Sequence, residues 1–565
     1  MPAMENIERV RESGFDPIRF IDDIAKVSRA DSQIPDPEAG VGRKCFAFSE
    51  QEDRANEVAE RSAREILRVR EEGREYNIER DAIGNLYITF FGEHPQLPAI
   101  ITISHLDSVD NGGKYDGVAG VAAALDILQV LAKRREKPQR NYRVAVFRSE
   151  ESSPRNGVGC LGSSVATGTI SPGALHNVTY EGDTPLEIAF SARYGADRWN
   201  AVQDQLAQHK ITPENTAASF ELHIEQSSVI AMNDSGMAIV VGGIGGAWRE
   251  RVTKEPVRSE VISTPEGSYK RLTLEFHGTP DHTGGTPPNP AFFNAGGSML
   301  YRKDALVASG FVLNHLLRSK EISVLRSETA RDTGYTSVPS HHVVELLVPA
   351  STDLSKTLLN LTAQAKEGFG VTLEAREEAY QGVSAQVVAS DRVRQLLNIP
   401  SVVAALSTKA WGKEALEYGS TRATVTDYHL TPDGLSYKLD MRDVNTEDRD
   451  ELLGRIRSRA ATTIGKDPLS HVSHKEHQPV DAGLVERLKG VAREQNVPFI
   501  EMPSLPGHDS DRIAAAGIPA AMVLVRQNDG VSHNPRERME DDHFSVGSRV
   551  IKETVLKMLD EPVAA

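Results

Sequence analysis

Imidazole and carboxylate side chains occur together where an apolar segment of the chain ends. His105 lies near the end of the segment 98–106, Asp107 follows it, and Asp116 comes nine residues after Asp107. Such side chains bind first-row divalent metals when strand ends hold them rigidly. Asp107 is spaced to hold the His105 ring nitrogen that faces away from a metal. Taken singly, His105 or Asp116 is more often part of a polar loop or a helix cap.

Two adjacent acids, Glu150 and Glu151, follow another apolar segment, 141–148. Adjacent carboxylates repel each other, so one commonly binds a cation while the other stays free to move protons. Considered alone, these two residues fit a solvent-exposed pair of charges as well as they fit a functional site.

Two further histidines extend the pattern. His223 interrupts the apolar run 219–224, and His533 follows the very apolar run 519–525 in a glycine-containing loop. A lone histidine such as His223 is more often a hydrogen-bonded core residue. Together, however, three histidines, one aspartate and one glutamate follow successive expected strands, and open α/β sheets place their sites at the carboxyl ends of strands. The combination predicts a metal-binding site there.

An alternation of helices and strands must position these residues. Helical spacing covers 52–70 and 117–133, and Asp116 is expected to be the N-cap of the second helix. Strands are expected at 85–91, 98–106, 141–148, 219–224, 498–502 and 519–525. This rhythm predicts an α/β fold with a mostly parallel sheet covered on both faces.

The middle of the chain differs from its ends. Strand patterns at 272–277 and 435–441 and helical patterns at 305–317 and 446–464 favour an inserted α+β domain. We expect a catalytic domain formed by 1–240 and 444–565, with the insert at 241–443. The glycine-rich segment 242–246 would be the hinge. The stretch 320–420 gives no firm element assignment.

Length and charge limit the function further. The chain has 565 residues and a net charge of −16, which argues against nucleic acid or an anionic membrane as a partner. Its two cysteines, Cys45 and Cys160, exclude a disulfide framework, and Cys160 is expected to be a small core residue. No secretory signal or membrane-spanning run is visible, so a cytoplasmic location is expected.

Seven motifs in this order resemble the hydantoinase/carbamoylase branch of the M20-type metal-dependent amidohydrolases. That branch includes N-carbamoyl-L-amino-acid hydrolases, allantoate amidohydrolases and ureidoglycolate amidohydrolases. The resemblance covers about 15–245 and 430–560 well and the middle only in patches. The motifs are SHLDSV with NGG and DG (104–117), FRSEE (147–151), GVGCLGS (157–163), ELHIEQ (221–226), LDMR (439–442), GHD (507–509) and GVSHNP (530–535).

The resemblance implies two divalent metal ions per subunit, which can share a hydroxide and polarise the scissile carbonyl. His105 and His223 would hold one ion, Glu151 and His533 the other, and Asp116 would bridge both. Glu150 would be the general base that activates the water and then protonates the leaving nitrogen. Ligands without cysteine suit zinc, manganese, cobalt or nickel alike.

The resemblance also implies how a substrate is held. Gln226 looks like the family's contact to the substrate amide, and Arg442 looks like its carboxylate clamp. The segment 281–287 resembles the family's H-A-G-T-T-P, so His282 would stabilise the oxyanion from a neighbouring subunit. The inserted domain would then be a lid and a dimerisation domain, and the protein a homodimer.

This chain departs from the family pattern in two ways. His429 stands where the family has an asparagine that contacts substrate, and extra length falls at about 250–270, 288–301 and 320–420. The implied function is hydrolysis of a linear amide or ureido C–N bond in an N-carbamoyl amino acid, an N-acyl amino acid or a ureide. A metallo-aminopeptidase or dipeptidase of the broader M20 group is the enzymatic alternative, and a non-enzymatic binding protein is the third. The remaining histidines, His341–His342 and His471, His474 and His477, are expected to be surface residues, the latter three in a loop.

Overall fold

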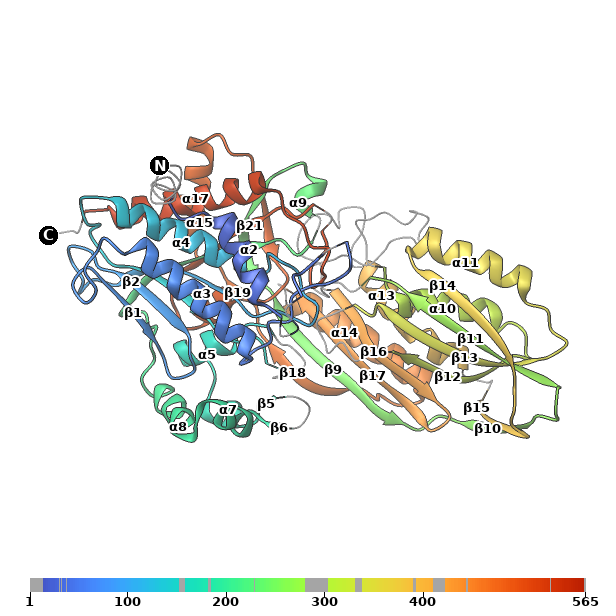
Figure 1. Cartoon of the computed structure of the whole chain (residues 1–565). Helices are drawn as coiled ribbons and strands as arrows, with labels where there is room; N and C mark the ends of the chain where they lie inside the picture. Colours follow the sequence, from blue (N-terminus) through green and yellow to red (C-terminus); the bar gives the residue numbers. More distant parts are fainter. Residues whose placement is uncertain are drawn as a thin grey trace, which may run out of the picture. The chain divides into compact units, whose positions relative to one another are not determined.

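The computed structural model describes residues 14–562 except positions 30, 32, 37, 152–157, 181–183, 228, 280–302, 331–337, 390–392, 410–421, 444–445 and 529. The chain divides into two compact units, each with its own sheet and hydrophobic core (Figure 1). Unit 1 comprises 1–244 and 478–565, and unit 2 comprises 245–477. The division after Ile244 falls inside the glycine-rich segment 242–246.

Unit 1 is built on a mixed sheet whose centre is parallel. In spatial order, the central strands β4 (Tyr142–Phe147), β3 (Ala99–His105), β7 (Thr216–Ile224) and β21 (Ala520–Val525) each pair in parallel with the next. The flanking strands β2 (Leu86–Phe90) and β8 (Met237–Ile244) are antiparallel to this centre. The sheet continues through β1 (Tyr76–Arg80), β19 (Gln478–Pro479) and β20 (Ile500–Ser504). The expected α/β fold is therefore confirmed, with antiparallel outer strands.

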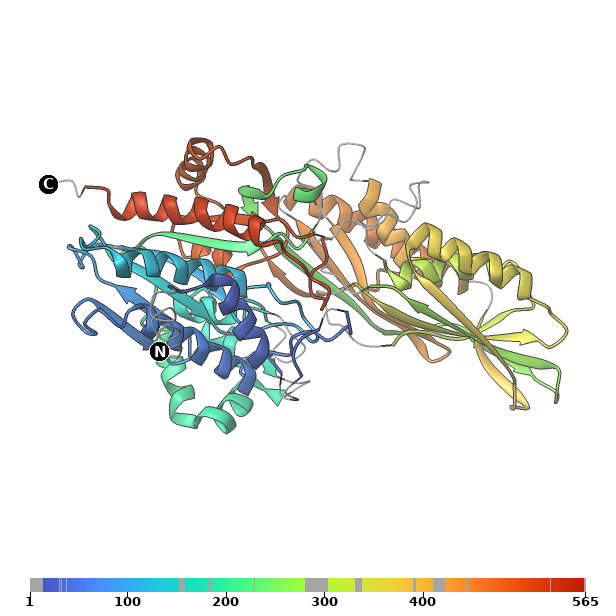
Figure 2. The ribbon, with the colours of Figure 1, turned by 45° about the horizontal axis from the view of Figure 1, so that its top comes forward.

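Helices cover both faces of this sheet. Ile100 and Ile101 are neighbours in β3, yet they belong to two different hydrophobic clusters, as they must when a central strand is buried on both sides. One face carries α2 (Pro17–Val27), α3 (Glu50–Ile66), α4 (Val118–Lys133), α15 (Ala482–Glu494) and α17 (Asp541–Leu559), and α4 and α17 lie side by side in Figure 2. The other face carries α5 (Leu161–Thr167) and α16 (Asp509–Ala515).

Shorter elements complete unit 1. They are α6 (Pro172–His176), β5 (Thr179–Tyr180), β6 (Thr184–Pro185), α7 (Leu186–Tyr194), α8 (Ala196–Gln205) and α9 (Val229–Met232).

Unit 2 has an antiparallel sheet with helices on one face. Its main strand order is β14 (Thr372–Ala379), β11 (Tyr269–His277), β13 (His341–Pro349), β12 (Ser323–Thr329), β16 (Arg422–Thr431), β17 (Gly434–Asp443), β9 (Gly246–Glu255) and β18 (Ser470–Lys475), with β10 (Ser259–Ser263) and β15 (Ser384–Val388) attached. The helices are α10 (Ala305–Leu316), α11 (Ser355–Phe369), α12 (Val393–Leu397), α13 (Ile399–Lys409) and α14 (Thr446–Ile464). Leu272, Leu274 and Phe276 of β11 point into the core with these helices, whereas Thr273, Glu275 and His277 are half-buried on the opposite face.

The structure fills in what the sequence pattern left open. The stretch 320–420, which has no clear periodicity, contains the strands β12 to β15 and the helices α11 to α13. Unit 2 also runs beyond 443 to His477, because Leu452, Leu453 and Ile456 of α14 are part of its core. Among the described helices, none is long and apolar enough to cross a lipid bilayer.

Three expectations about single residues are wrong. The N-cap of α4 is Gly117, not Asp116, and no side chain caps that helix. His471 and His474 are exposed as expected, but they lie in a strand rather than a loop. The polar sequence of this strand, β18, hid its pairing with β9. His342 is fully buried, because it lies one position from His341 in β13 and therefore points to the helix-covered face.

Buried His342 makes the stability of unit 2 sensitive to acid. Burial lowers the pKa of His342 from 6.5 to about 3, while the unfolded chain binds a proton near the ordinary value. The unfolded state therefore gains protons first, and stability falls as pH drops below 6.5 toward 3. Between about pH 7 and pH 5 this protonation should lower the free energy of unfolding of the parent by roughly 2 kcal/mol. In His342→Gln, which cannot bind the proton, the decrease over the same range should be smaller by that amount.

Urea unfolding of the parent and the variant at both pH values measures this effect. Comparing the pH dependence, rather than the absolute stability, cancels the packing change caused by the substitution. An identical pH dependence in the two proteins would contradict the assignment.

Candidate metal centre

The five expected metal ligands come from separate loops and strand ends of unit 1. His105 is the last residue of β3, His223 lies near the end of β7, Glu151 follows β4, and His533 follows β21. Asp116 immediately precedes the N-cap of α4. The carboxyl ends of neighbouring parallel strands meet at one edge of a sheet, so the fold brings these side chains together. All five are buried.

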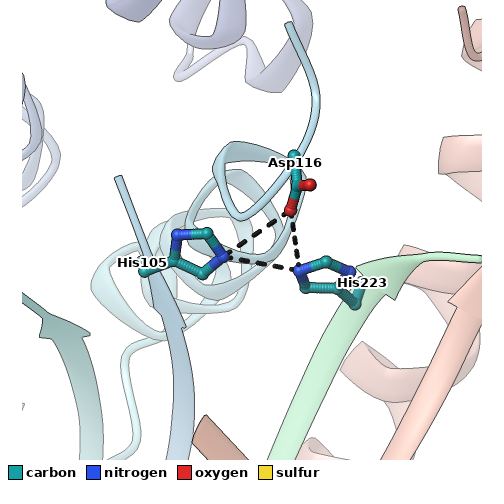
Figure 3. A group of neighbouring side chains, drawn as sticks. All are labelled: His105, Asp116 and His223. Atoms are coloured by element: carbon teal, nitrogen blue, oxygen red, sulfur yellow. Dashed lines mark hydrogen bonds and ion pairs between the residues drawn. The ribbon is translucent and has the colours of Figure 1, made fainter. Parts of the chain in front are cut away.

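One trio of ligand atoms comes from His105, His223 and Asp116 (Figure 3). The Nε2 atoms of the two histidines are 3.5 Å apart. Oδ1 of Asp116 lies 3.7 Å from Nε2 of His105 and 3.1 Å from Nε2 of His223. Two imidazole nitrogens and one carboxylate oxygen thus face a common point.

A second trio comes from Asp116, Glu151 and His533. Nε2 of His533 lies 3.6 Å from Oδ2 of Asp116 and 3.5 Å from Oε1 of Glu151. Asp116 therefore turns one carboxylate oxygen toward each trio. A carboxylate placed in this way can bridge two ions.

Local backbone structure fixes Asp116 in this position. Gly117 has a φ of 69°, and a Cβ atom there would lie 2.5 Å from Cε1 of His105, so only glycine fits the turn. The backbone N–H groups of Tyr115 and Asp116 both donate to Oε1 of buried Glu537, at 2.8 and 3.1 Å. Glu537 thereby holds the loop that carries the shared carboxylate.

Asp107 connects two of the strand ends. Its Oδ1 lies 3.3 Å from Nδ1 of His105. The same carboxylate accepts hydrogen bonds from the backbone N–H groups of Glu150 and Glu151, at 3.1 and 3.0 Å. Asp107 therefore holds the diacid turn and lies close to the imidazole of His105.

Glu150 lies beside the first trio and outside it. Its Oε2 is 3.6 Å from Nε2 of His105, and its Oε1 accepts a hydrogen bond from Sγ of Cys160 at 3.4 Å. Cys160 is buried as expected, and it also contacts this acid. Ser149, just before Glu150, has a φ of 55°, a conformation that is uncommon for a residue other than glycine.

Negative charge is concentrated in this site. Burial, followed by the neighbouring carboxylates, raises the pKa of Glu150 and of Glu151 well above its ordinary value. Burial also raises the pKa of Glu537 to about 8. The pKa of Asp116 is lowered well below its ordinary range against the effect of burial, because His223, His533 and His105 surround it. Buried oxygen and imidazole donors with excess negative charge are the chemistry that a divalent cation satisfies, so the residues fit a metal centre.

The expected substrate-binding residues are placed differently. Gln226 lies within the centre, where its Nε2 donates to Oδ2 of Asp116 at 2.8 Å. Arg442 and His429 belong to unit 2, in β17 and β16. His429 pairs in register with Ser436, six residues from Arg442, so the two side chains do not converge within one copy of the chain. His282 lies outside the described residues.

Several residues around the centre were not found from the sequence pattern. His508 of the GHD motif packs its ring 4.4 Å from that of His223, and Glu221, His223 and His508 form a further buried group. Buried Glu52 accepts a hydrogen bond from the backbone N–H of Ser149 at 2.9 Å. Glu537 follows His533 by four residues, and this proximity is the one sequence signal that could have marked it. The sequence pattern assigns no role to His508, Glu221 or Glu52, because the fold alone brings them near the centre.

A model of a known protein family matches most of this chain. The model described as peptidase family M20/M25/M40 matches residues 101–557. The chain belongs to this family. Membership places it among hydrolases of C–N bonds and confirms the resemblance drawn from the motifs.

Individual proteins similar to this M20 chain are named as a hydrolase, an amidohydrolase and an amidase. Ureidoglycolate hydrolase of Arabidopsis thaliana is 31% identical over 268 residues, which is 47% of each chain. N-carbamoyl-L-amino acid amidohydrolase of Geobacillus stearothermophilus is 25% identical over 92% of this chain and 94% of its own. A hydantoinase/carbamoylase family amidase of Burkholderia multivorans shares the fold, with a TM-score of 0.54 at 17% identity over 97% of this chain and 99% of its own.

The loop held by Glu537 gives a test of how this M20 centre is positioned. Glu537→Ala removes the acceptor for two backbone N–H groups and should weaken metal binding by about 10- to 100-fold, the usual effect of losing a residue that orients a ligand. Glu537→Gln keeps an oxygen acceptor and should lose much less.

Metal titration of the stripped protein by calorimetry compares the two variants with the parent. Equal metal affinity in Glu537→Ala and the parent would show that Asp116 is positioned by other contacts.

Proposed function

We propose that this M20 protein is a dinuclear metal-dependent hydrolase of a linear amide or ureido C–N bond. The substrate would be an N-carbamoyl amino acid, an N-acyl amino acid or a ureide. One observation carries the proposal: Asp116 turns Oδ1 toward His105 and His223, and Oδ2 toward His533 of the second trio. A site for a single ion would need only one trio of ligands, whereas here two buried trios share the carboxylate of Asp116.

The donor set favours two ions of the zinc, manganese, cobalt or nickel type, because it contains imidazole and carboxylate but no thiolate. His105 and His223 would hold one ion, Glu151 and His533 the other, and Asp116 both. Bound there, the pair would polarise the scissile carbonyl and make a nearby water more acidic.

Glu150 is the residue that we assign to proton transfer. It is buried, it lies at the edge of the first trio, and it belongs to neither trio. From there its carboxylate would take a proton from the attacking water and deliver it to the leaving nitrogen. Asp107 would support this role, because it holds the backbone of Glu150 and the ring of His105 at once.

Arg442 supports the proposal that the substrate bears a carboxylate. Its Nε donates to Oδ2 of Asp440 at 2.7 Å, and its buried Nη2 has no hydrogen-bond partner among the described residues. A guanidinium held at one nitrogen with another left open suits a bound carboxylate. We assign Gln226 to the substrate amide on the family resemblance, and His429 to a substrate contact in place of the family asparagine.

Unit 2 would act as a lid and a dimerisation domain in this proposal. Arg442 belongs to unit 2 and position 282 falls within the sequence range of that unit, whereas every expected ligand belongs to unit 1. On the family resemblance, His282 would stabilise the oxyanion of a neighbouring subunit, and the protein would be a homodimer.

A substrate panel tests the function. The stripped protein should be inactive on N-carbamoyl amino acids, N-acyl amino acids, ureides and dipeptides, and one of the first three classes should be hydrolysed once Zn²⁺, Mn²⁺, Co²⁺ or Ni²⁺ is added. Ammonia and amine detection separates ureido from amide cleavage. Turnover of dipeptides alone would favour the aminopeptidase or dipeptidase alternative, and full turnover without metal would contradict the dinuclear proposal.

The two adjacent acids should respond differently to neutralisation. Glu150→Gln should keep both ions and lower kcat by about 10²–10⁴-fold, because a proton shuttle is removed. Glu151→Gln should instead lower the number of bound ions, since Glu151 belongs to the second trio and Glu150 does not. Metal analysis and kinetics on both variants decide the assignment, and loss of metal in Glu150→Gln alone would reverse the two roles.

A further inference from the structure

A second cluster with metal-binding chemistry lies in unit 2, on the sheet face opposite its helices. Glu275 and His277 are alternate residues of β11, so both point to that face. His341 begins β13 and pairs in register with His277. The two imidazole rings stack with their centroids 4.6 Å apart and an angle of 23° between them. All three side chains are half-buried.

The three polar groups face one another without forming hydrogen bonds. Oε2 of Glu275 lies 3.8 Å from Nε2 of His277 and 3.6 Å from Nε2 of His341. Both separations exceed the range of a hydrogen bond. Nε2 of His341 is buried and has no hydrogen-bond partner among the described residues. Three possible ligand atoms thus lie within 4.8 Å of one another, and that of His341 is buried without a partner among the described residues.

These separations suit a bound ion. Around a tetrahedral zinc ion with bonds of about 2.0–2.2 Å, ligand atoms lie about 3.3–3.5 Å apart. The observed 3.6 and 3.8 Å need only a small contraction, which half-buried side chains can make. Two imidazoles and one carboxylate favour a borderline ion such as Zn²⁺ over Mg²⁺ or Ca²⁺, which prefer oxygen ligands alone.

The neighbouring charges leave the ligand oxygen available. Arg376 of β14 approaches the other carboxylate oxygen of Glu275, Oε1, at 3.7 Å. The same guanidinium group lies 3.8 Å from Glu374, the register partner of Glu275, and Arg376 is 71% exposed. Its charge is therefore shared and screened by solvent.

We propose that Glu275, His277 and His341 form a second, separate metal site that binds a zinc-like divalent ion. The ion ties the last residue of β11 to the first residue of β13, and its fourth position is left for water. This site is independent of the proposed catalytic centre, since it shares no residue with it and lies in the other unit.

Metal counting on the full-length protein tests the proposal. Parent and variants are equilibrated with free Zn²⁺ held at about 1 μM, and bound zinc per chain is measured by mass spectrometry. The parent should hold one ion more than the double variant H277Q/H341Q. H471Q/H474Q is the matched control: it removes another histidine pair of unit 2, in which Nδ1 of His474 already contacts Nε2 of His471 at 3.4 Å. This control should hold as many ions as the parent.

Glu275→Gln keeps the proposal testable if the double variant does not fold. It replaces a charged ligand by a neutral amide and should raise the Kd of the extra ion at least about tenfold. Loss of a residue that only hydrogen-bonds a metal ligand already lowers metal affinity by about 10- to 100-fold. Both Glu275→Gln and H277Q/H341Q holding as many ions as the parent, at unchanged affinity, would overturn the proposal. So would loss of the ion from H471Q/H474Q alone.

Discussion

The shared carboxylate of Asp116 is the constraint on which the rest of unit 1 depends. A buried carboxylate is unfavourable unless polar or charged partners satisfy it, and Asp116 has three histidines around it, His105, His223 and His533. Each of its oxygens faces a different trio, so its position must be fixed in translation and in rotation. The contacts around it fix this position: the turn at Gly117 leaves room only for glycine, and Glu537 accepts hydrogen bonds from two N–H groups of the loop.

The parallel centre of the sheet supplies the rigidity that such a site needs. Residues at the ends of β3, β4, β7 and β21 meet at one edge because those strands run in one direction side by side. Asp107 then couples two of the ends through three contacts, to the ring of His105 and to the backbone of Glu150 and Glu151. The uncommon φ angles at Ser149, Gln226 and His533 show that the loops, not the strands, absorb the strain of aiming these side chains.

Unit 2 follows a different physical plan. Its antiparallel strands alternate between a helix-covered apolar face and a polar face, so one sheet can form a core and still carry charged groups. Arg442 and His429 lie in its β17 and β16 strands, and Glu275, His277 and His341 gather on the polar face of β11 and β13. The additional strands and helices within 320–420 enlarge this sheet and its core.

The sequence by itself determined the α/β plan, most element positions and which five side chains the fold brings together in unit 1, since hydrophobic periodicity and family motifs are local signals. It misplaced Asp116 as a helix cap, because a residue just before a helix looks the same whether it caps the helix or turns toward histidines. Only the tertiary structure decided which partners far apart in the chain meet. Glu537 reaches Asp116 across 421 residues. His277 meets His341 through strand register, and burial of His342 follows from the face to which β13 turns it. Such contacts depend on which distant strands pair, and no short turn joins β11 to β13 to set their register.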